Sequence, residues 1–362
     1  MSFEKGSVAL RVFKSSVGMT LPEDVVDRLK QQSVPPLDLI TNEGFIGWAT
    51  GRHILDNNIT EETVVISGRV RATLVKGEKK IPGALFKAEC KQEELALMDA
   101  RGTTYLKRAD KAEIAKSVKD RMLPDMPPTL ASIDMVSNKD GCYATAMSDS
   151  QVDLLTSSWN RAIGYSIYPY TPTVAAQLLC NFDTRALEPT SFSSEVADGK
   201  VEQDIGTEFL TWLWYFSETT DGMNDNFAFA LDGPFTFIHE GLGAHEIVVR
   251  KGNPGISQEA KAALLAGKKL KKAKLTVAQG NTAWTCSMDA YSWAFGSLKM
   301  PKSEESFDPI SSFEERMISI GTFVGAIESL FKKFMAIRVS QEQWDNEVAG
   351  IRKWVSDRVS MA

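Results

Sequence analysis

The sequence predicts an α+β fold in which antiparallel sheets pack against helices. Short stretches of alternating apolar and polar residues, separated by turn sequences, are typical of strands joined as hairpins. Longer stretches with apolar residues every three or four positions are typical of amphipathic helices. The chain has 362 residues, of which 43% are hydrophobic and 24% are charged, so it is long enough for two or three domains.

The N-terminal region, residues 1–165, is expected to mix strands and helices. GSVALRVF alternates as a strand does, and LPEDVVDRLKQQ then predicts a helix. The β-branched residues of TVVISGRVRATLVKGEKK predict strands with a turn at 76–78, followed by a helix in IPGALFKAECKQEELALM. LASIDMVSNKDGCYATAM predicts a hairpin with its turn at 138–141, and a helix is predicted from Ser148 to Gly164.

One helix of this region is rich in cations. It lies in the stretch YLKRADKAEIAKSVKDRMLPDMPP, residues 105–128. Ile114, Val118 and Met122 recur every four residues and predict an apolar stripe that faces protein, which leaves lysine and arginine around the rest of the helix. A D-x-x-E capping signal begins at Asp110, and the prolines after the helix predict an extended exit.

Charge is segregated along residues 166–300. Residues 183–246 hold thirteen acidic residues against two basic ones, and they contribute most to the net charge of −6. Residues 250–274 then hold eight cations against Glu259 alone. There, ISQEAKAALLAG predicts a short helix and KLKKAKLTV a strand with Lys272 and Lys274 on its polar face, paired with TAWTCSM after a turn.

The C-terminal region, residues 301–362, predicts a pair of helices. The first is SFEERMISIGTFVGAIESLFKKFMAIR, with a capping box formed by Ser312 and Glu315. The second begins near Ser340 and carries a stripe of Trp344, Val348, Ile351 and Val355.

Several functional classes lack support in the sequence. There is no GxxxxGK[ST] or GxGxxG motif, so neither a nucleotide-hydrolysing loop nor a dinucleotide fold is predicted. His239 and His245 in HEGLGAHE lack the i,i+4 spacing of a zinc helix, and no other acidic or histidine pattern predicts a metal site. We therefore expect no catalytic residue, no metal and no cofactor.

The remaining composition predicts a cytoplasmic protein with buried, reduced thiols. Four cysteines, Cys90, Cys142, Cys180 and Cys286, have no CxxC spacing, and the first residues contain no apolar signal segment. The longest apolar run, residues 318–327, is too short to cross a membrane, so no membrane anchor is predicted.

Two clusters of cations predict a surface that binds phosphate. A single charge run is usually a solvated face, but two such runs beside a separate acidic block favour a polyanion as partner. No aromatic residue is interleaved among the lysines, which favours contacts with the DNA backbone over base stacking. The candidate DNA-binding residues are Lys76, Lys79, Lys80, Lys87, Lys107, Arg108, Lys111, Lys116, Lys119, Arg121, Arg250, Lys251, Lys268, Lys269, Lys271, Lys272 and Lys274.

The order of these segments resembles the recombination-associated RdgC family of bacteria and phages. The resemblance is carried by YLKRADKAEIAKSVKDRM before LPDMPP, SIDMV with its hairpin, FLTWLWYF, and ISQEAKAALLAGKKLKKAKLTV, over roughly residues 47–301. It implies an elongated or curved monomer and a homodimer that closes into a ring around double- or single-stranded DNA. It also implies nucleoid association and an indirect effect on RecA-type recombinases, without an active site.

The resemblance further implies where two subunits would touch. These positions are Asp125, Met126 and Pro127 after the basic helix, and Asn253 and Pro254 before the Ser257-capped helix. At both places this sequence departs from the residues that the family carries. Two alternatives from other classes stay open: a metal-dependent nuclease acting in recombination, and an interaction protein whose acidic block at 183–246 mimics DNA.

Overall fold

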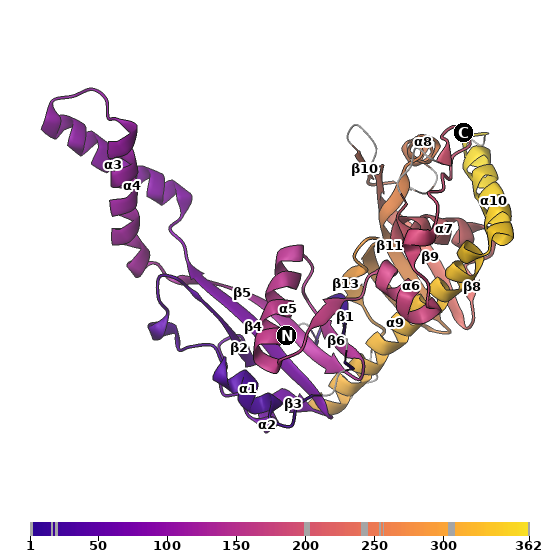
Figure 1. Cartoon of the computed structure of the whole chain (residues 1–362), viewed down its shortest axis with the longest axis horizontal. Helices are drawn as coiled ribbons and strands as arrows, with labels where there is room; N and C mark the ends of the chain where they lie inside the picture. Colours follow the sequence, from indigo (N-terminus) through magenta and orange to yellow (C-terminus); the bar gives the residue numbers. More distant parts are fainter. Residues whose placement is uncertain are drawn as a thin grey trace. The chain divides into compact units, whose positions relative to one another are not determined.

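The computed structural model has the predicted α+β class. Its described part contains ten α-helices and thirteen β-strands, and the paired strands run antiparallel (Figure 1). The structure describes residues 3–15, 17–18, 21–198, 203–239, 245–252, 255, 257–302 and 308–360. Within these ranges, no helix combines the length and the apolar composition that a membrane span requires.

The chain divides into two compact units. The larger unit comprises Met1–Thr20 and Val136–Ala362, and the smaller unit comprises Leu21–Met135. The predicted domain boundaries after residues 165 and 300 both fall inside the larger unit. The first strand belongs to the larger unit because it pairs with strands that come much later in the sequence.

The larger unit is built on an antiparallel sheet. Its strands follow the order β10-β9-β11-β12-β13-β1-β6, with β7 paired to β1 and β8 paired to β9. They are β1 (Val8–Ser15), β6 (Gly141–Ala144), β7 (Ile167–Pro169), β8 (Met223–Asn224), β9 (Phe227–Ile238), β10 (Glu246–Val249), β11 (Lys269–Gln279), β12 (Thr282–Asp289) and β13 (Ala294–Lys299). The predicted hairpin of KLKKAKLTV with TAWTCSM is confirmed, with Lys274 opposite Ser287.

Six helices belong to the larger unit. They are α5 (Asp149–Ile163), α6 (Pro172–Cys180), α7 (Ile205–Thr219), α8 (Gln258–Leu265), α9 (Pro309–Val339) and α10 (Gln341–Ser360). The segment FLTWLWYF lies in α7, where Phe209 and Trp212 are fully buried and contact Phe334 of α9 through their rings. The predicted stripe of α10, from Trp344 to Val355, is buried as expected.

The start of α9 differs from the prediction. The helix begins at Pro309 and is capped by Asp308, whose carboxylate accepts a hydrogen bond from the Ser311 N–H at 3.1 Å. The predicted capping box at Ser312 and Glu315 therefore lies inside the helix. The reason is that Asp308 caps a helix as well as serine does, and Pro309 fits the first helical position, where no N–H is needed.

The smaller unit carries a short sheet with the order β5-β4-β2, and β3 pairs with β4. Its elements are α1 (Val25–Gln31), a 3-10 turn (Leu37–Leu39), β2 (Phe45–Thr50), α2 (Glu61–Val64), β3 (Val65–Ile66), β4 (Arg69–Lys79), α3 (Gly83–Arg101), α4 (Arg108–Met122), a second 3-10 turn (Leu123–Asp125) and β5 (Pro128–Asn138).

The predicted turn at 76–78 is wrong. β4 runs without interruption to Lys79, and Gly77 pairs with Phe45 of β2. The chain reverses earlier, at Ser67 and Gly68, which both have positive φ angles. Glycine tolerates that conformation without a Cβ clash, so the SG dipeptide is the better turn signal.

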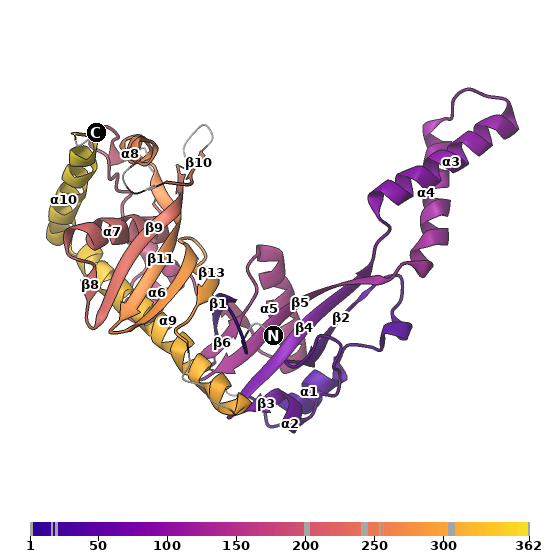
Figure 2. The ribbon, with the colours of Figure 1, turned by 180° about the vertical axis from the view of Figure 1, so that it is seen from behind.

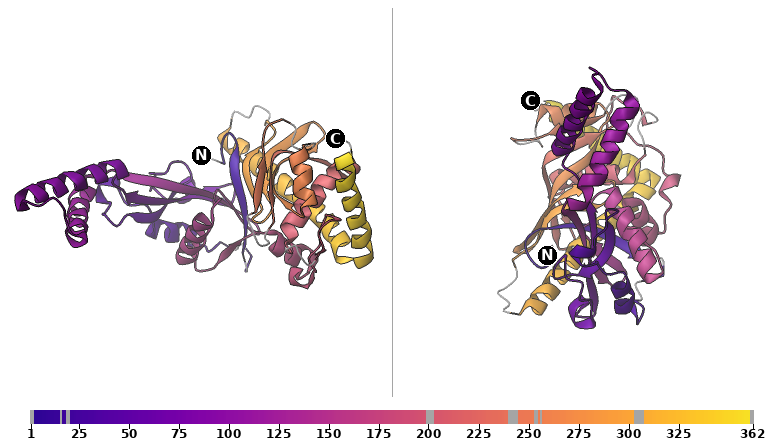
Figure 3. Two further views of the ribbon diagram at one scale, coloured as in Figure 1. Left: turned by 90° about the horizontal axis from the view of Figure 1, so that it is seen from above. Right: turned by 90° about the vertical axis from the view of Figure 1, so that its left-hand side faces the viewer.

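Helices α3 and α4 form a hairpin between β4 and β5. In all views it lies beyond the ends of these two strands, away from α1 and α2 (Figures 1, 2 and 3). Gly102 ends α3 in the left-handed conformation. No residue of α3 is buried, and Val118 is the only buried residue of α4. Both helices therefore expose most of their side chains.

Candidate nucleic-acid interface

Five exposed cations lie on α4 and at its start. At 3.6 residues per turn, Arg108, Lys111, Lys116 and Lys119 span roughly 140° of the helix circumference, and Lys107 precedes the first turn. We call these five residues the basic stripe. All five are exposed, and no described carboxylate lies within ion-pair distance of their side chains. At 1.5 Å per residue, the helical part from Arg108 to Lys119 is about 16 Å long.

The apolar residues of α4 face α3, and in angle they lie next to Lys107 and Lys111. Val118 is buried there, and Ile114 and Met122 are half-buried, as the apolar stripe predicted. The N-cap is Lys107, and Asp110 sits one turn into the helix, where its carboxylate accepts a hydrogen bond from the Lys107 N–H at 3.2 Å. The predicted cap at Asp110 is therefore three residues too late.

Ion pairs between the two helices use other charged residues. Arg101 of α3 donates to the carboxylate of Asp110 at 2.9 Å, and this hydrogen bond holds the pKa of Asp110 below its ordinary value. Arg121 of α4 lies 3.1 Å from carboxylates of both Glu89 and Glu93. Arg121 thus links α4 to α3, whereas the basic stripe is left free.

The basic stripe does not come from an excess of positive charge in the hairpin. Residues 81–127 contain nine cations and eight carboxylates. Asp110 pairs with Arg101, whereas Glu113 and Asp120 lie within one helical turn of Lys116 without forming an ion pair with it. The cations of the basic stripe are therefore free of ion pairs, although carboxylates lie on the same helix.

Tyr105 adds an aromatic ring next to the basic stripe. It lies in the loop between α3 and α4, two residues before Lys107, and is 72% exposed. The sequence interpretation gave this residue no role, because no aromatic residue lies among the lysines themselves. The feature of the sequence that could have indicated a role for Tyr105 is its position at the start of the cation-rich stretch 105–128.

The candidate lysines at the end of β4 all have polar partners. Glu78 pairs with Lys80 and, at 3.6 Å, with Lys76, and the hydrogen bond from Lys80 lowers the pKa of Glu78. Lys79 donates to the carbonyl oxygen of Pro124 at 2.6 Å. Lys87 on α3 is exposed and has no described ion-pair partner.

Lys269 is wrongly placed among the DNA-binding candidates. Its side chain is buried, and its ammonium lies 2.9 Å from the carboxylate of Glu208, which is 0% exposed. The other oxygen of Glu208 lies 2.8 Å from Nε of the buried Arg338. These three charges form an ion triad inside the larger unit, and none of them can reach DNA.

The other lysines of β11 alternate as predicted but are paired. Lys272 lies 3.1 Å from Asp289 of β12, and Lys274 lies 3.8 Å from Asp232 of β9. Lys271 lies 3.6 Å from Glu246. The neighbouring strands therefore supply one carboxylate for each lysine, and the predicted cationic wall is a mixed-charge surface.

The remaining candidates lie near β10 and α8. Arg250 and Lys251 are exposed, Lys268 is half-exposed, and none of the three has an ion-pair partner among the described residues. Asn253 and Pro254, the predicted subunit contact, lie outside the described residues.

The other predicted subunit contact lies at the base of the hairpin. Asp125 and Pro127 are exposed and Met126 is half-buried. The Met126 N–H donates to the Leu123 carbonyl oxygen at 3.2 Å, which closes the 3-10 turn at this point. A contact between two copies of the chain through these residues stays a prediction.

The acidic block does not form one continuous acidic surface. Glu208 is buried in the ion triad, Asp204 caps α7, and Glu218 accepts hydrogen bonds from the indoles of Trp214 and Trp354. Asp198 lies 2.7 Å from Arg352 of α10. These structural roles disperse the carboxylates, which weakens the DNA-mimic interpretation.

The candidate metal ligands do not come together in the described part of the chain. Over the described ranges, no group of three or more His, Cys, Asp or Glu residues could hold a metal ion. His239 donates its backbone N–H to the His245 carbonyl oxygen at 3.1 Å, so the two histidines are joined through the backbone.

All four cysteines are free, but only two of them are buried. Burial raises the pKa of Cys142 far above its ordinary value and that of Cys286 to about 12. Cys90 and Cys180 are half-buried, which corrects the expectation that all four thiols are buried.

Comparison with known proteins adds no family assignment. No protein-family model matches the chain, and no curated protein sequence is similar to it.

Proposed function

We propose that the chain binds DNA through the phosphate backbone, without reading base sequence, and that the basic stripe of α4 is its main contact. One observation carries the proposal: five exposed cations lie on α4 and at its start, and none forms an ion pair with a described carboxylate. Lysine and arginine in such an array displace the counterions that condense on DNA, which favours binding.

The salt dependence of binding tests this proposal. If the five cations each neutralise one phosphate, the logarithm of duplex affinity falls with the logarithm of salt concentration at a slope of about −4.5 for each hairpin engaged. Fluorescence anisotropy with duplexes of unrelated sequence should give equal affinities. An affinity that does not change with salt concentration, or a strong preference for one duplex sequence, would contradict the proposal.

The resemblance to the recombination-associated RdgC family supports a second part of this proposal. Two copies of the chain would enclose DNA as a ring and limit the access of a RecA-type recombinase to it. Sedimentation velocity of the pure protein, followed by retention on circular but not on linear duplex DNA at high salt, tests enclosure directly. A monomer that leaves both DNA forms equally fast would rule out the ring and would leave backbone binding untouched.

A cleavage assay separates this function from a nuclease. End-labelled DNA incubated with the protein and Mg²⁺ or Mn²⁺ should remain intact. Cleavage that increases with protein concentration would show that the protein is a nuclease and would contradict a function in binding alone.

A further inference from the structure

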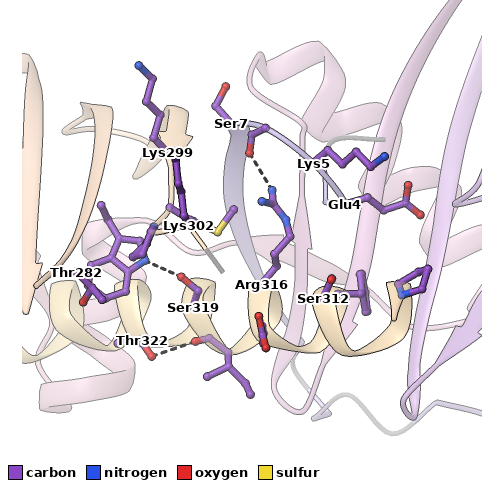
Figure 4. A pocket seen from close by; sticks show the side chains of 18 of the residues that line it. Glu4, Lys5, Ser7, Thr282, Lys299, Lys302, Ser312, Arg316, Ser319 and Thr322 are labelled. Atoms are coloured by element: carbon purple, nitrogen blue, oxygen red, sulfur yellow. Dashed lines mark hydrogen bonds between the residues drawn. The ribbon is translucent and has the colours of Figure 1, made fainter. Parts of the chain in front are cut away.

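A groove of about 1240 Å³ opens on the larger unit, and none of the DNA-binding candidates lines it. Three stretches of the sequence line it: residues 4–7 before β1, residues at the ends of β11, β12 and β13, and the first four turns of α9. Figure 4 shows Arg316 reaching from α9 toward the segment that contains Ser7, with Lys299 and Lys5 on either side. The groove therefore joins residues that are some 300 positions apart.

The lining of the groove is cationic in an acidic chain. Lys5, Lys299, Lys302 and Arg316 face two carboxylates, Glu4 and Glu315. The three lysines are exposed, and no described carboxylate lies within ion-pair distance of them. The whole chain carries a formal charge of −6, so a net excess of two cations among the described residues that line the groove is a local reversal of charge.

Arg316 fixes the shape of the groove. Its Nε donates to the Phe3 carbonyl oxygen and its Nη2 to the Gly6 carbonyl oxygen, both at 3.0 Å. These bonds hold the segment before β1 against α9 (Figure 4). Because the guanidinium is already bonded to two carbonyl oxygens, it contributes positive charge while the lysines stay free to bind.

Hydroxyl groups complete the polar lining. The Trp284 indole N–H donates to the Ser319 hydroxyl oxygen at 2.9 Å, which leaves the hydroxyl proton of Ser319 free to donate. Ser7, Thr282 and Ser312 add further hydroxyl groups. Trp284 is only 3% exposed, so its ring cannot stack on a base or a sugar. The groove therefore offers cations and donors, but no aromatic platform.

We propose that this groove binds a small anion that carries a chain of phosphate groups. Lysine ammonium groups bind phosphate as point charges, and three of them on two separate segments suit several phosphate groups better than one. The volume is large enough for such a ligand, since ligand pockets usually measure about 300–1,000 Å³. The same chemistry could come from a free polyphosphate or from the phosphate chain of a nucleoside triphosphate.

Isothermal titration calorimetry with the full chain tests the site. Tripolyphosphate and ATP should bind with similar affinity and a stoichiometry of one, and orthophosphate should bind at least tenfold more weakly. The double variant K299E/K302E should lose at least tenfold in affinity for tripolyphosphate. The matched control K139E changes an exposed lysine in the turn between β5 and β6, and it should bind as the unaltered chain does. Circular dichroism and thermal unfolding should be the same for all three proteins.

Four outcomes would overturn the proposal. They are the absence of binding to any of the three anions, an equally tight orthophosphate complex, an affinity that K299E/K302E does not change, and a loss of duplex DNA affinity in K299E/K302E as large as the loss for tripolyphosphate. The last result would make the groove part of a DNA path. Because the basic stripe is untouched in K299E/K302E, failure of this site leaves the DNA proposal standing.

Discussion

Helix α4 and strand β11 carry similar sequence signals but differ in how their lysines are placed. Both are short, rich in lysine and polar on one side. On α4 the cations of the basic stripe are exposed and have no described ion-pair partner. On β11, Lys269 is buried and Lys271, Lys272 and Lys274 each lie within 4 Å of a carboxylate.

The difference follows from the number of neighbours that each element has. β11 lies between β9 and β12, and each lysine of a central strand has a residue directly opposite it on both sides. Asp232 and Asp289 occupy such positions. α4 packs mainly against α3, and most of its surface meets solvent. A lysine-rich run is therefore a stronger indication of an anion-binding surface on an exposed helix than on a central strand.

The largest expected effect is on stability and concerns the buried lysine of β11. The change Lys269→Met leaves Glu208 paired with Arg338 but removes a buried hydrogen bond between charged groups, which costs about 1.5–3 kcal/mol of the free energy of unfolding. Urea unfolding followed by tryptophan fluorescence measures it, since seven of the eight tryptophans belong to the larger unit.

Lys274→Met is the matched control on the same strand. Its ion pair with Asp232 is exposed, and such pairs contribute about 0–1 kcal/mol. Equal losses of stability in the two variants would mean that the buried ion triad contributes no more to the free energy of unfolding than an exposed ion pair does.

The second effect is on DNA affinity and concerns the basic stripe. The variant R108E/K111E/K116E/K119E should bind duplex DNA at least about 100-fold more weakly at low salt, because four phosphate contacts become repulsive. The salt slope should become shallower by about 3.6, which is 0.9 for each lost contact. Fluorescence anisotropy across a salt series measures both values.

A control with the same change of charge uses exposed cations elsewhere. Lys30, Lys139, Lys332 and Lys353 are all exposed and lie outside the stripe. Reversal of these four should reduce affinity only slightly, through the net charge. A loss as large as that of the stripe variant would show that affinity depends on total charge and not on α4.

The third effect separates single-stranded from duplex DNA. Tyr105→Ala removes a ring that is 72% exposed beside the basic stripe, and a stacked base contributes about 1–3 kcal/mol. We expect about a fivefold loss of affinity for a single strand and less than a twofold loss for a duplex. Tyr105→Phe retains the ring and should bind normally; an equal loss in both variants would assign the effect to the hydroxyl group.

The smallest effect is expected on β11. The variant K271Q/K272Q/K274Q removes three lysines that already have carboxylate partners, so duplex affinity should change by less than about threefold. Anisotropy under the same conditions as for the stripe variant gives the comparison. A loss comparable to that of the stripe variant would restore β11 to the DNA interface.

The sequence alone predicted most elements of the fold. Periodicity located α3, α4, α5, α9 and α10 and the hairpin of β11 with β12, because amphipathic patterns record which side of an element is buried. It misplaced the turn near 76–78 and the N-caps of α4 and α9. At these places several neighbouring residues are suitable for a turn or a cap, and the periodicity of apolar residues does not distinguish between them. The exposure of the cations on α4 was expected from the sequence, but Arg121, which was grouped with them, pairs with Glu89 and Glu93. Their role in binding DNA stays a prediction.

What the sequence determined by itself is therefore the α+β class, the amphipathic elements and the cation-rich character of α4. The tertiary structure alone decided which cations are free. Whether a lysine meets a carboxylate depends on strand order and helix pairing, as Lys269 with Glu208 and Lys274 with Asp232 show. It also brought Lys5, Lys299 and Arg316 to one groove. Such contacts join residues far apart in the chain, and periodicity reports burial but not the identity of the neighbour.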